Sequence, residues 1–192
     1  MIWSSLLIVI TGYILGSIPS AYVAGRLTRG VDIRELGDGN MGAANAWREL
    51  GPRAGIAVGI VDVGKGALTV LIANAVGISL LMVLVAGLAA VAGHNWPLFL
   101  RFRGGRGEAT TLGILSALMP REMLIVLGIA AVPFLISRNV TFTSVFLFVP
   151  LPLVAWLSGA PGILIAYSIA LPCLVGFTHY ITTRHLPAKV KP

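Results

Sequence analysis

Cysteine and charge are both scarce in this sequence. Only one of its 192 residues is a cysteine, Cys173, which excludes an intramolecular disulfide and a zinc site built from cysteines. Charged residues make up 11% of the chain, whereas soluble domains contain about 25%. No acidic residue follows Glu122, so the last spans can supply no carboxylate base. With 57% hydrophobic residues, the composition indicates that lipid is the main solvent.

Long apolar segments divide the chain. A helix needs roughly 20 apolar residues to cross a hydrocarbon core of about 30 Å. Two of the segments are short and predict either a helical hairpin that does not cross fully or two short spans. We therefore expect one all-α, polytopic integral membrane domain over residues 1–192, with about seven transmembrane segments and five or six as alternatives. The segments are residues 2–27, 53–75, 78–99, 108–119, 123–137, 142–157 and 162–182.

Basic residues gather on one side of this predicted bundle. The opposite turns, near residues 77–79 and 158–162, contain none, and Arg121 is the exception. The positive-inside bias predicts a cytoplasmic basic side, an outside N-terminus and a cytoplasmic C-terminus. There is no basic stripe or aromatic platform for nucleic acid. The basic side holds Arg26, Arg29, Arg34, Arg48, Arg53, Arg101, Arg103, Arg106, Arg138, Arg184, Lys189 and Lys191.

The first polar cluster is the glycine-rich stretch GDGNMGAANAWR at 37–48. Its glycines allow positive φ and close backbone approach. The side chains of Asn40, Asn45 and Arg48 supply donors suited to anionic oxygens. Asn45 and Arg48 are three residues apart, so they would share one face of a helix. The stretch predicts either part of an anion site or a turn that caps a surface helix.

The second cluster, DVGKG at 62–66, places charge inside an apolar segment. If the helix begins near Arg53, Lys65 lies about 18 Å along it. A charged pair at that depth is costly unless it faces a polar cavity or a partner. We interpret Asp62 and Lys65 as a candidate functional site, and a self-neutralising pair three residues apart is the alternative.

The third cluster runs from GHNWP at 93–97 to RFRGGRGEATT at 101–111. Glycines beside arginines let backbone N–H groups form a concave anion nest. A helix beginning at Gly107 or Glu108 would point its positive end at the same place. Phosphate is the expected guest, because Arg106 can bind it with two parallel hydrogen bonds. The alternative is a basic loop that touches anionic lipid headgroups.

The fourth cluster is sparse and lies in the last third of the chain. Its members are Arg138, Thr141, Thr143, Ser144, His179 and Thr182. A lone histidine at a membrane interface is usually a neighbour of headgroups rather than a catalyst. No group of histidines and carboxylates is spaced for a metal. The four clusters together indicate a cationic, glycine-lined pocket for a phosphorylated ligand, and no cofactor is expected.

At these clusters the sequence resembles the bacterial acyl-phosphate-dependent glycerol-3-phosphate acyltransferases, the PlsY family. The resemblance runs from GSIPS at 16–20 through the three glycine-containing clusters to His179, in the same order, and covers nearly the whole chain. It implies an enzyme of phospholipid biosynthesis in the bacterial inner membrane, with its active site facing the cytoplasm. The implied substrates are acyl phosphate and glycerol 3-phosphate, and no obligate protein partner is inferred.

The resemblance also implies roles for individual residues. His179, Arg48 and Lys65 correspond to catalytic positions. His179 is the candidate proton acceptor, although a phosphate oxygen of the substrate could also take the proton. The implied substrate-binding residues are Asn40, Asn45, Gly104, Gly105, Arg106, Gly107, Thr141 and Ser144.

Several positions depart from the usual family pattern. They are Asp38, Ala44, Arg106, Glu108, Thr141 and Thr182, where the family usually has Ser, Thr, Lys, Val, Ser and Asn. Two function classes other than an acyltransferase remain open from sequence. One is a small transporter of a phosphorylated solute, which predicts inverted repeats that the sequence does not display. The other is a non-catalytic binder of a phosphorylated solute or lipid.

Overall fold

The computed structural model describes residues 2–184, and helices account for all of its regular secondary structure within that range. An all-α fold is therefore confirmed for the described residues. The elements are α1 (Ile2–Gly16), α2 (Ser20–Arg29), η1 (Ile33–Glu35), α3 (Ala43–Leu50), α4 (Pro52–Ala75), α5 (Leu80–Asn95), η2 (Leu98–Leu100), α6 (Glu108–Leu118), α7 (Pro120–Ser137), α8 (Val140–Phe148), α9 (Leu151–Leu157) and α10 (Gly162–Thr183).

Prolines interrupt the helices within two of the apolar segments. The segment over 2–27 breaks before Pro19 into α1 and α2, and the segment over 142–157 breaks at Pro150 into α8 and α9. Proline has no backbone N–H and its ring clashes with the preceding turn. The apolar pattern continues across each break, so hydropathy alone does not reveal it. Each of the two stretches, Ile2–Arg29 and Val140–Leu157, is still long and apolar enough to cross a membrane as one span.

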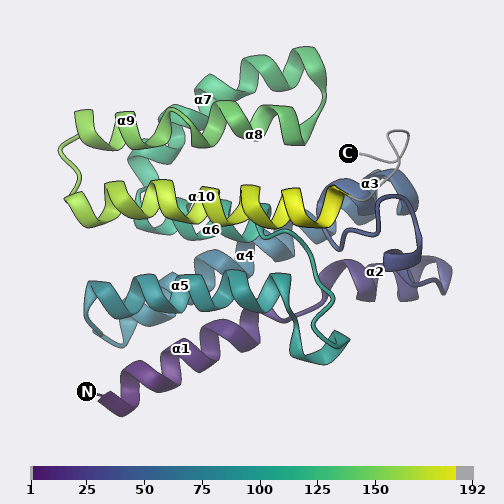
Figure 1. Ribbon diagram of the computed structural model, residues 1–192, viewed down its shortest axis with the longest axis horizontal. Coiled ribbons are helices and arrows are strands. Elements are labelled where there is room, and N and C mark those ends of the chain that lie inside the picture. The colour runs from purple at the N-terminus through teal and green to yellow at the C-terminus, as the bar shows by residue number, and fades with distance from the viewer. Residues whose placement is uncertain (1, 185–192) are drawn as a thin grey trace.

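The helices lie roughly parallel to one long axis of the molecule (Figure 1). α1 packs along α5, and α4 packs against α6. α7, α8 and α9 form an outer layer beside α10. The start of α1 and the end of α10 lie at opposite ends of this axis (Figure 1).

Small residues let the central helices approach closely. A Cβ added at Gly113 of α6 would collide with the carbonyl of Val63 in α4, and one added at Gly66 would collide with the carbonyl of Thr110. In lipid, helices gain little from the hydrophobic effect and associate through such close packing. The α4–α6 contact therefore fixes the beginning of α6 beside the polar residues of α4.

Within residues 2–184, six helical stretches are long and apolar enough to cross a membrane, and α6 is a shorter apolar helix. With 11 residues, α6 extends about 16 Å, well short of a hydrocarbon core of about 30 Å. α7 has 18 residues and is longer than the sequence suggests. The short pair flanking Pro120 thus consists of one half-length helix and one full-length helix.

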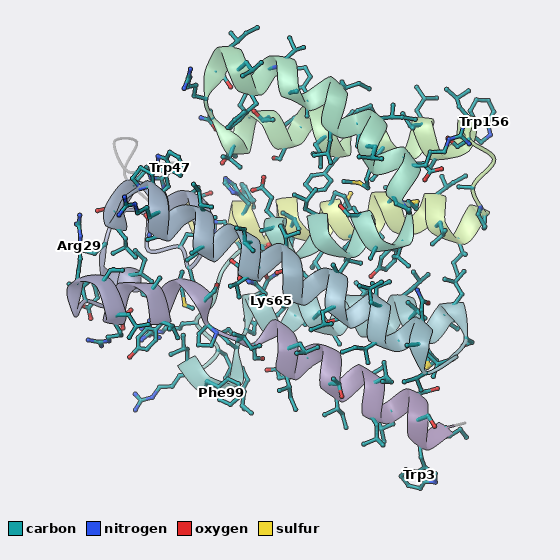
Figure 2. The ribbon with its side chains drawn as sticks, turned by 180° about the vertical axis from the view of Figure 1, so that it is seen from behind. Trp3, Arg29, Trp47, Lys65, Phe99 and Trp156 are labelled. Carbon is teal, nitrogen blue, oxygen red and sulfur yellow. The ribbon has the colours of Figure 1, made fainter. Side chains whose placement is uncertain are left out.

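Aromatic residues mark the two ends of the bundle. Trp3 and Trp156 lie at one end, whereas Arg29 and Trp47 lie at the other, with Lys65 between them (Figure 2). Trp3 and Trp156 are exposed. Tryptophan is enriched at membrane–water interfaces, so these positions agree with a membrane-spanning bundle. Lys189 and Lys191, which contributed to the orientation expected from sequence, lie outside the described residues.

Candidate functional site

A cavity of about 180 Å³ with charged side chains in its lining lies at the arginine-rich end of the bundle, where the loop before α3 meets the beginning of α6. We call it the Arg106 cavity. Polar side chains from α4, α5, α8 and α10 also reach it. The lining residues are Asp38, Asn40, Gly42, Ala43, Ala44, Asp62, His94, Arg106, Gly107, Glu108, Ala109, Leu112, Val140, Thr141, Thr143, Ser144, Leu147, Phe148 and His179.

Arg106 is the buried cation of this cavity. Its Nη1 donates to Asp38 Oδ2 at 2.9 Å, and its Nε donates to Thr182 Oγ1 at 3.1 Å. Asp38 Oδ2 also lies 3.4 Å from Nη2 of Arg48, whose side chain is 43% exposed. Two residues from distant parts of the chain, Asp38 and Thr182, thus hold the Arg106 guanidinium, and Arg48 approaches the cavity through Asp38.

The start of α6 supplies a second anion-binding feature. Gly107 precedes the helix with a φ of 84°, and no side chain caps the first-turn amides. This confirms the helix start that the sequence predicts at Glu108. Gly107, Glu108 and Ala109 line the cavity, so the positive end of the α6 dipole lies at its wall.

Gly104 and Gly105 have a different role from the one predicted. Their amides donate to the carbonyls of Asn95 and His94, at 3.1 Å and 3.0 Å. A Cβ at Gly105 would collide with the His94 imidazole. These two amides are therefore not free to bind an anion, because they attach the loop to the end of α5. Only the Arg106–Gly107 half of the predicted nest faces the cavity.

A buried network surrounds Asp62 beside the cavity. Asp62 Oδ1 accepts a hydrogen bond from Ser20 Oγ at 2.6 Å and pairs with Lys65 Nζ at 2.9 Å. His94 Nδ1 lies 3.7 Å from the same oxygen, and Lys65 Nζ also donates to the carbonyl of Ile18. The other oxygen, Oδ2, is buried and has no hydrogen-bond partner among residues 2–184.

The network brings Asp62 and His94 to the cavity and keeps Lys65 behind them. Lys65 is buried but does not line the Arg106 cavity. The break before Pro19 is what supplies its Ile18 partner, because the chain leaves the helix there. Sequence reasoning singled out the Asp62–Lys65 pair but missed the position of His94, which only the packing of α5 on α4 determines.

Asn45 supports the loop that carries Asp38 and Asn40. It is fully buried, and its Nδ2 donates to the carbonyls of Leu36 and Asn40, at 3.1 Å and 3.0 Å. Asn45 does not line the cavity, whereas Asn40 does. The structure therefore places the two predicted asparagines differently, one at the cavity and one beneath its loop.

The loop is further fixed by a pair outside the cavity. Arg34 donates to the Asp32 carboxylate through Nη2 at 2.6 Å, and this hydrogen bond holds the pKa of Asp32 below its usual value. Arg34 also donates to the carbonyl of Leu100, which ties the loop to η2. The backbone of the loop is thus held on two sides.

The opposite wall of the cavity comes from α8 and α10. Thr141, Ser144 and His179, which the sequence offers as substrate-binding and catalytic candidates, line it. Glu108 also lines it and interacts with Ser144. Thr178 Oγ1 donates to the carbonyl of Arg106 at 3.1 Å, which ties α10 to the loop before α6.

A second, larger hollow of about 510 Å³ adjoins this wall. We call it the α10 groove. It is mainly apolar and shares Glu108, Thr141, Ser144, Phe148 and His179 with the Arg106 cavity. The remaining lining residues are Val145, Val149, Pro152, Ser168, Ile169, Pro172, Cys173, Val175 and Gly176. A cavity that contains charged side chains and an apolar groove therefore meet at one wall.

In residues 2–184, no group of three or more His, Cys, Asp or Glu is arranged to hold a metal ion.

The fold and this site define a class, namely a polytopic helical membrane protein that can bind an amphiphilic phosphorylated ligand. A family profile described as glycerol-3-phosphate acyltransferase matches residues 6–189. The chain is 48% identical over 179 residues to glycerol-3-phosphate acyltransferase 4 of Dehalococcoides mccartyi, covering 93% of this chain and 97% of that one. The chain therefore belongs to the glycerol-3-phosphate acyltransferase family.

Other relatives and solved structures agree. The chain is 38% identical over 192 residues to a Synechococcus glycerol-3-phosphate acyltransferase, covering 100% of this chain and 96% of the relative. The crystal structure of PlsY (YgiH), an integral membrane glycerol 3-phosphate acyltransferase in its glycerol 3-phosphate form, matches with a TM-score of 0.86. That match has 34% identity and covers 98% of this chain and 94% of the other. The lysophosphatidic acid form matches with a TM-score of 0.83 and 33% identity over the same shares.

Proposed function

We propose that this protein transfers a fatty acyl group from acyl phosphate to the 1-hydroxyl of glycerol 3-phosphate, giving lysophosphatidic acid and phosphate. The observation that carries the proposal is the wall shared by the Arg106 cavity and the α10 groove. An acyl phosphate has a phosphate head and an apolar tail, and the two hollows match these two parts. Membership of the acyltransferase family supports the same reaction.

Phosphate binding is assigned to the Arg106 side of the cavity. The Arg106 guanidinium carries a full positive charge at the cavity, and the first-turn amides of α6 add N–H donors with partial positive charge. Arg48 approaches from the α3 side and supplies a second guanidinium. Asn40, Thr141 and Ser144 line the same space and can bind hydroxyl or phosphate oxygens.

The reaction needs positioning more than a strong base, because an acyl phosphate is already activated. The oxygen of the 1-hydroxyl forms a bond to the acyl carbonyl carbon, and the bond from that carbon to the phosphate oxygen breaks. The hydroxyl proton passes to His179, or to an oxygen of the departing phosphate. Guanidinium groups stabilise the negative charge that develops on the phosphate, and fixed substrates avoid an entropic cost.

Residues behind the cavity act by positioning. Lys65 neutralises Asp62, whose unpartnered Oδ2 can accept a hydrogen bond from the acceptor's hydroxyl. Asn45 holds the loop that presents Asn40. Gly104 and Gly105 fasten the Arg106 loop to α5. In this account Lys65, Asn45 and these glycines contribute without touching phosphate.

Seven membrane segments in one domain are part of the proposal, with α6 as a half-length fourth segment. The basic loops favour a cytoplasmic position of the cavity and an outside N-terminus. A bacterial inner membrane is the expected location. The proposed reaction requires no cofactor and no protein partner.

Phosphate release by the purified protein tests the proposed function. Palmitoyl phosphate is supplied in detergent or lipid, with and without glycerol 3-phosphate. We expect release that depends on the acceptor. Phosphate release at the same rate without the acceptor would indicate a phosphatase. No phosphate release in either case would contradict the proposed acyltransferase activity.

A further inference from the structure

A carboxylate lies at the centre of the cationic side of the Arg106 cavity. Asp38 Oδ2 is 2.9 Å from Nη1 of Arg106 and 3.4 Å from Nη2 of Arg48, and the Asp38 side chain is only 1% exposed. Asp38 and Arg106 both line the cavity. The carboxylate oxygen therefore sits where two guanidinium groups stabilise an anionic oxygen most strongly.

Other negative groups leave an incoming phosphate few alternatives. Asp62 and Glu108 also line the cavity. Arg106 is the lining residue that always carries positive charge, and one of its terminal nitrogens is already paired with Asp38. A phosphate can reach the guanidinium groups only by sharing them with the carboxylate or by displacing it.

We propose that Asp38 is an internal competitor for the ligand's phosphate group, which occupies Arg48 and Arg106 in the empty site and thereby weakens phosphate binding. The proposal concerns the phosphate site of the acyl transfer proposed above and rests on it. Asp38 then lowers the affinity of the site for every ligand that carries a phosphate group, because each must offset the same competition.

The opposite role, an anchor that holds the arginines in place for phosphate, fits the contacts less well. Arg106 has two further attachments, since its Nε donates to Thr182 Oγ1 and its carbonyl accepts from Thr178 Oγ1. The Thr182 contact orients the Arg106 guanidinium and the Thr178 contact holds its backbone, and neither involves Asp38. Arg48 is 43% exposed and free to reorient toward a ligand.

Direct binding of inorganic phosphate and of glycerol 3-phosphate to the purified protein tests the proposal. Titration calorimetry compares the wild type with Asp38→Asn, which removes the charge and keeps the shape. Competition predicts a Kd about tenfold lower for both ligands in Asp38→Asn. An unchanged Kd would mean that Asp38 does not compete with phosphate, and a higher Kd would mean that its carboxylate anchors the arginines. Either result would overturn the proposal.

Three further variants keep the test decisive. Glu35→Gln removes one negative charge from an exposed position in the same loop, and its Kd is expected to stay within about twofold of the wild type. Asp38→Ser is a second neutral variant should Asp38→Asn fail to fold. Asp38→Glu keeps the charge and is expected to bind as weakly as the wild type; tight binding by it would contradict competition by charge.

The binding experiment is independent of turnover. It contains no acyl donor, so tighter phosphate binding by Asp38→Asn would stand even if acyl transfer were absent. Conversely, a wild type that transfers acyl groups while Asp38→Asn binds phosphate no better would overturn the competitor role alone. The two proposals can therefore fail separately.

Discussion

Arg106 and Asp38, 68 residues apart in the sequence, form a buried ion pair with an Nη1–Oδ2 distance of 2.9 Å. The pair joins the glycine-rich loop before α3 to the loop before α6. Thr182 of α10 is the third partner, through the Nε of Arg106. Three segments distant in the chain thus converge on one guanidinium, and this convergence forms the cavity.

Replacing Arg106 tests the phosphate site. Arg106→Ala is expected to lower kcat/KM for glycerol 3-phosphate by on the order of 100-fold, because it removes a charge-assisted contact to the phosphate. Arg106→Lys retains the charge without the two-pronged geometry and is expected to keep more of the activity. Both are measured by steady-state kinetics, with thermal unfolding to verify the fold. Near-normal kinetics in Arg106→Ala would refute the assignment.

The Asp62–Lys65 pair is predicted to be a stability element. Lys65→Met leaves the Asp62 carboxylate buried without its cation, and breaking such a pair costs about 3 kcal/mol or more. Asp62→Asn combined with Lys65→Met removes both charges and is expected to be more stable than Lys65→Met alone. Unfolding in detergent measures all four proteins of this cycle. If the two changes in unfolding free energy simply add, the interaction energy between Asp62 and Lys65 is zero and the prediction is wrong.

The close α4–α6 contact predicts a strong effect of one methyl group. Gly113→Ala places a Cβ against the Val63 carbonyl and is expected to destabilise the protein by about 2 kcal/mol. Gly128→Ala on α7 is the matched control, because in the described part of the chain the added Cβ meets no atom within 4 Å outside its own helix backbone. That change is expected to be neutral or slightly stabilising. Equal unfolding temperatures of the two variants would contradict the close packing.

The α10 groove predicts a dependence on acyl-chain length. Gly176 lines the groove, and within residues 2–184 a Cβ added there meets no atom within 4 Å outside its own helix backbone, so Gly176→Phe would introduce a ring from an open position of the groove. We expect kcat/KM for palmitoyl phosphate to fall about tenfold relative to that for octanoyl phosphate, because the longer tail loses more apolar contact. Gly128→Phe, which lies outside the groove, is the control. An equal loss for both donors would place the tail elsewhere.

Local chemistry explains how much of the site could be predicted from sequence. Apolar runs long enough to cross a membrane predict the helices. Glycines beside arginines predict the loop that precedes α6, which begins at Glu108. The sequence also singled out Asn40, Arg106 and His179, which the structure brings to one cavity. Each of these signals is carried by residues close together in the chain.

What the sequence could not reveal depends on contacts between distant segments. The backbone amides of Gly105 and Gly104 donate hydrogen bonds to the carbonyls of His94 and Asn95, and the sequence around the two glycines does not indicate these bonds. Asn45 donates a hydrogen bond to its own loop, at the Asn40 carbonyl. Lys65 donates one to the Ile18 carbonyl, in the segment between α1 and α2. The polar side chains predicted to bind phosphate are therefore divided between the cavity and its supports.

The central claim is tested most directly by mass spectrometry of the lipid product from purified protein, palmitoyl phosphate and glycerol 3-phosphate. The account predicts palmitoyl lysophosphatidic acid only when both substrates are present, in an amount equal to the phosphate released. Free palmitate in place of that product, or no product from a folded protein, would contradict it.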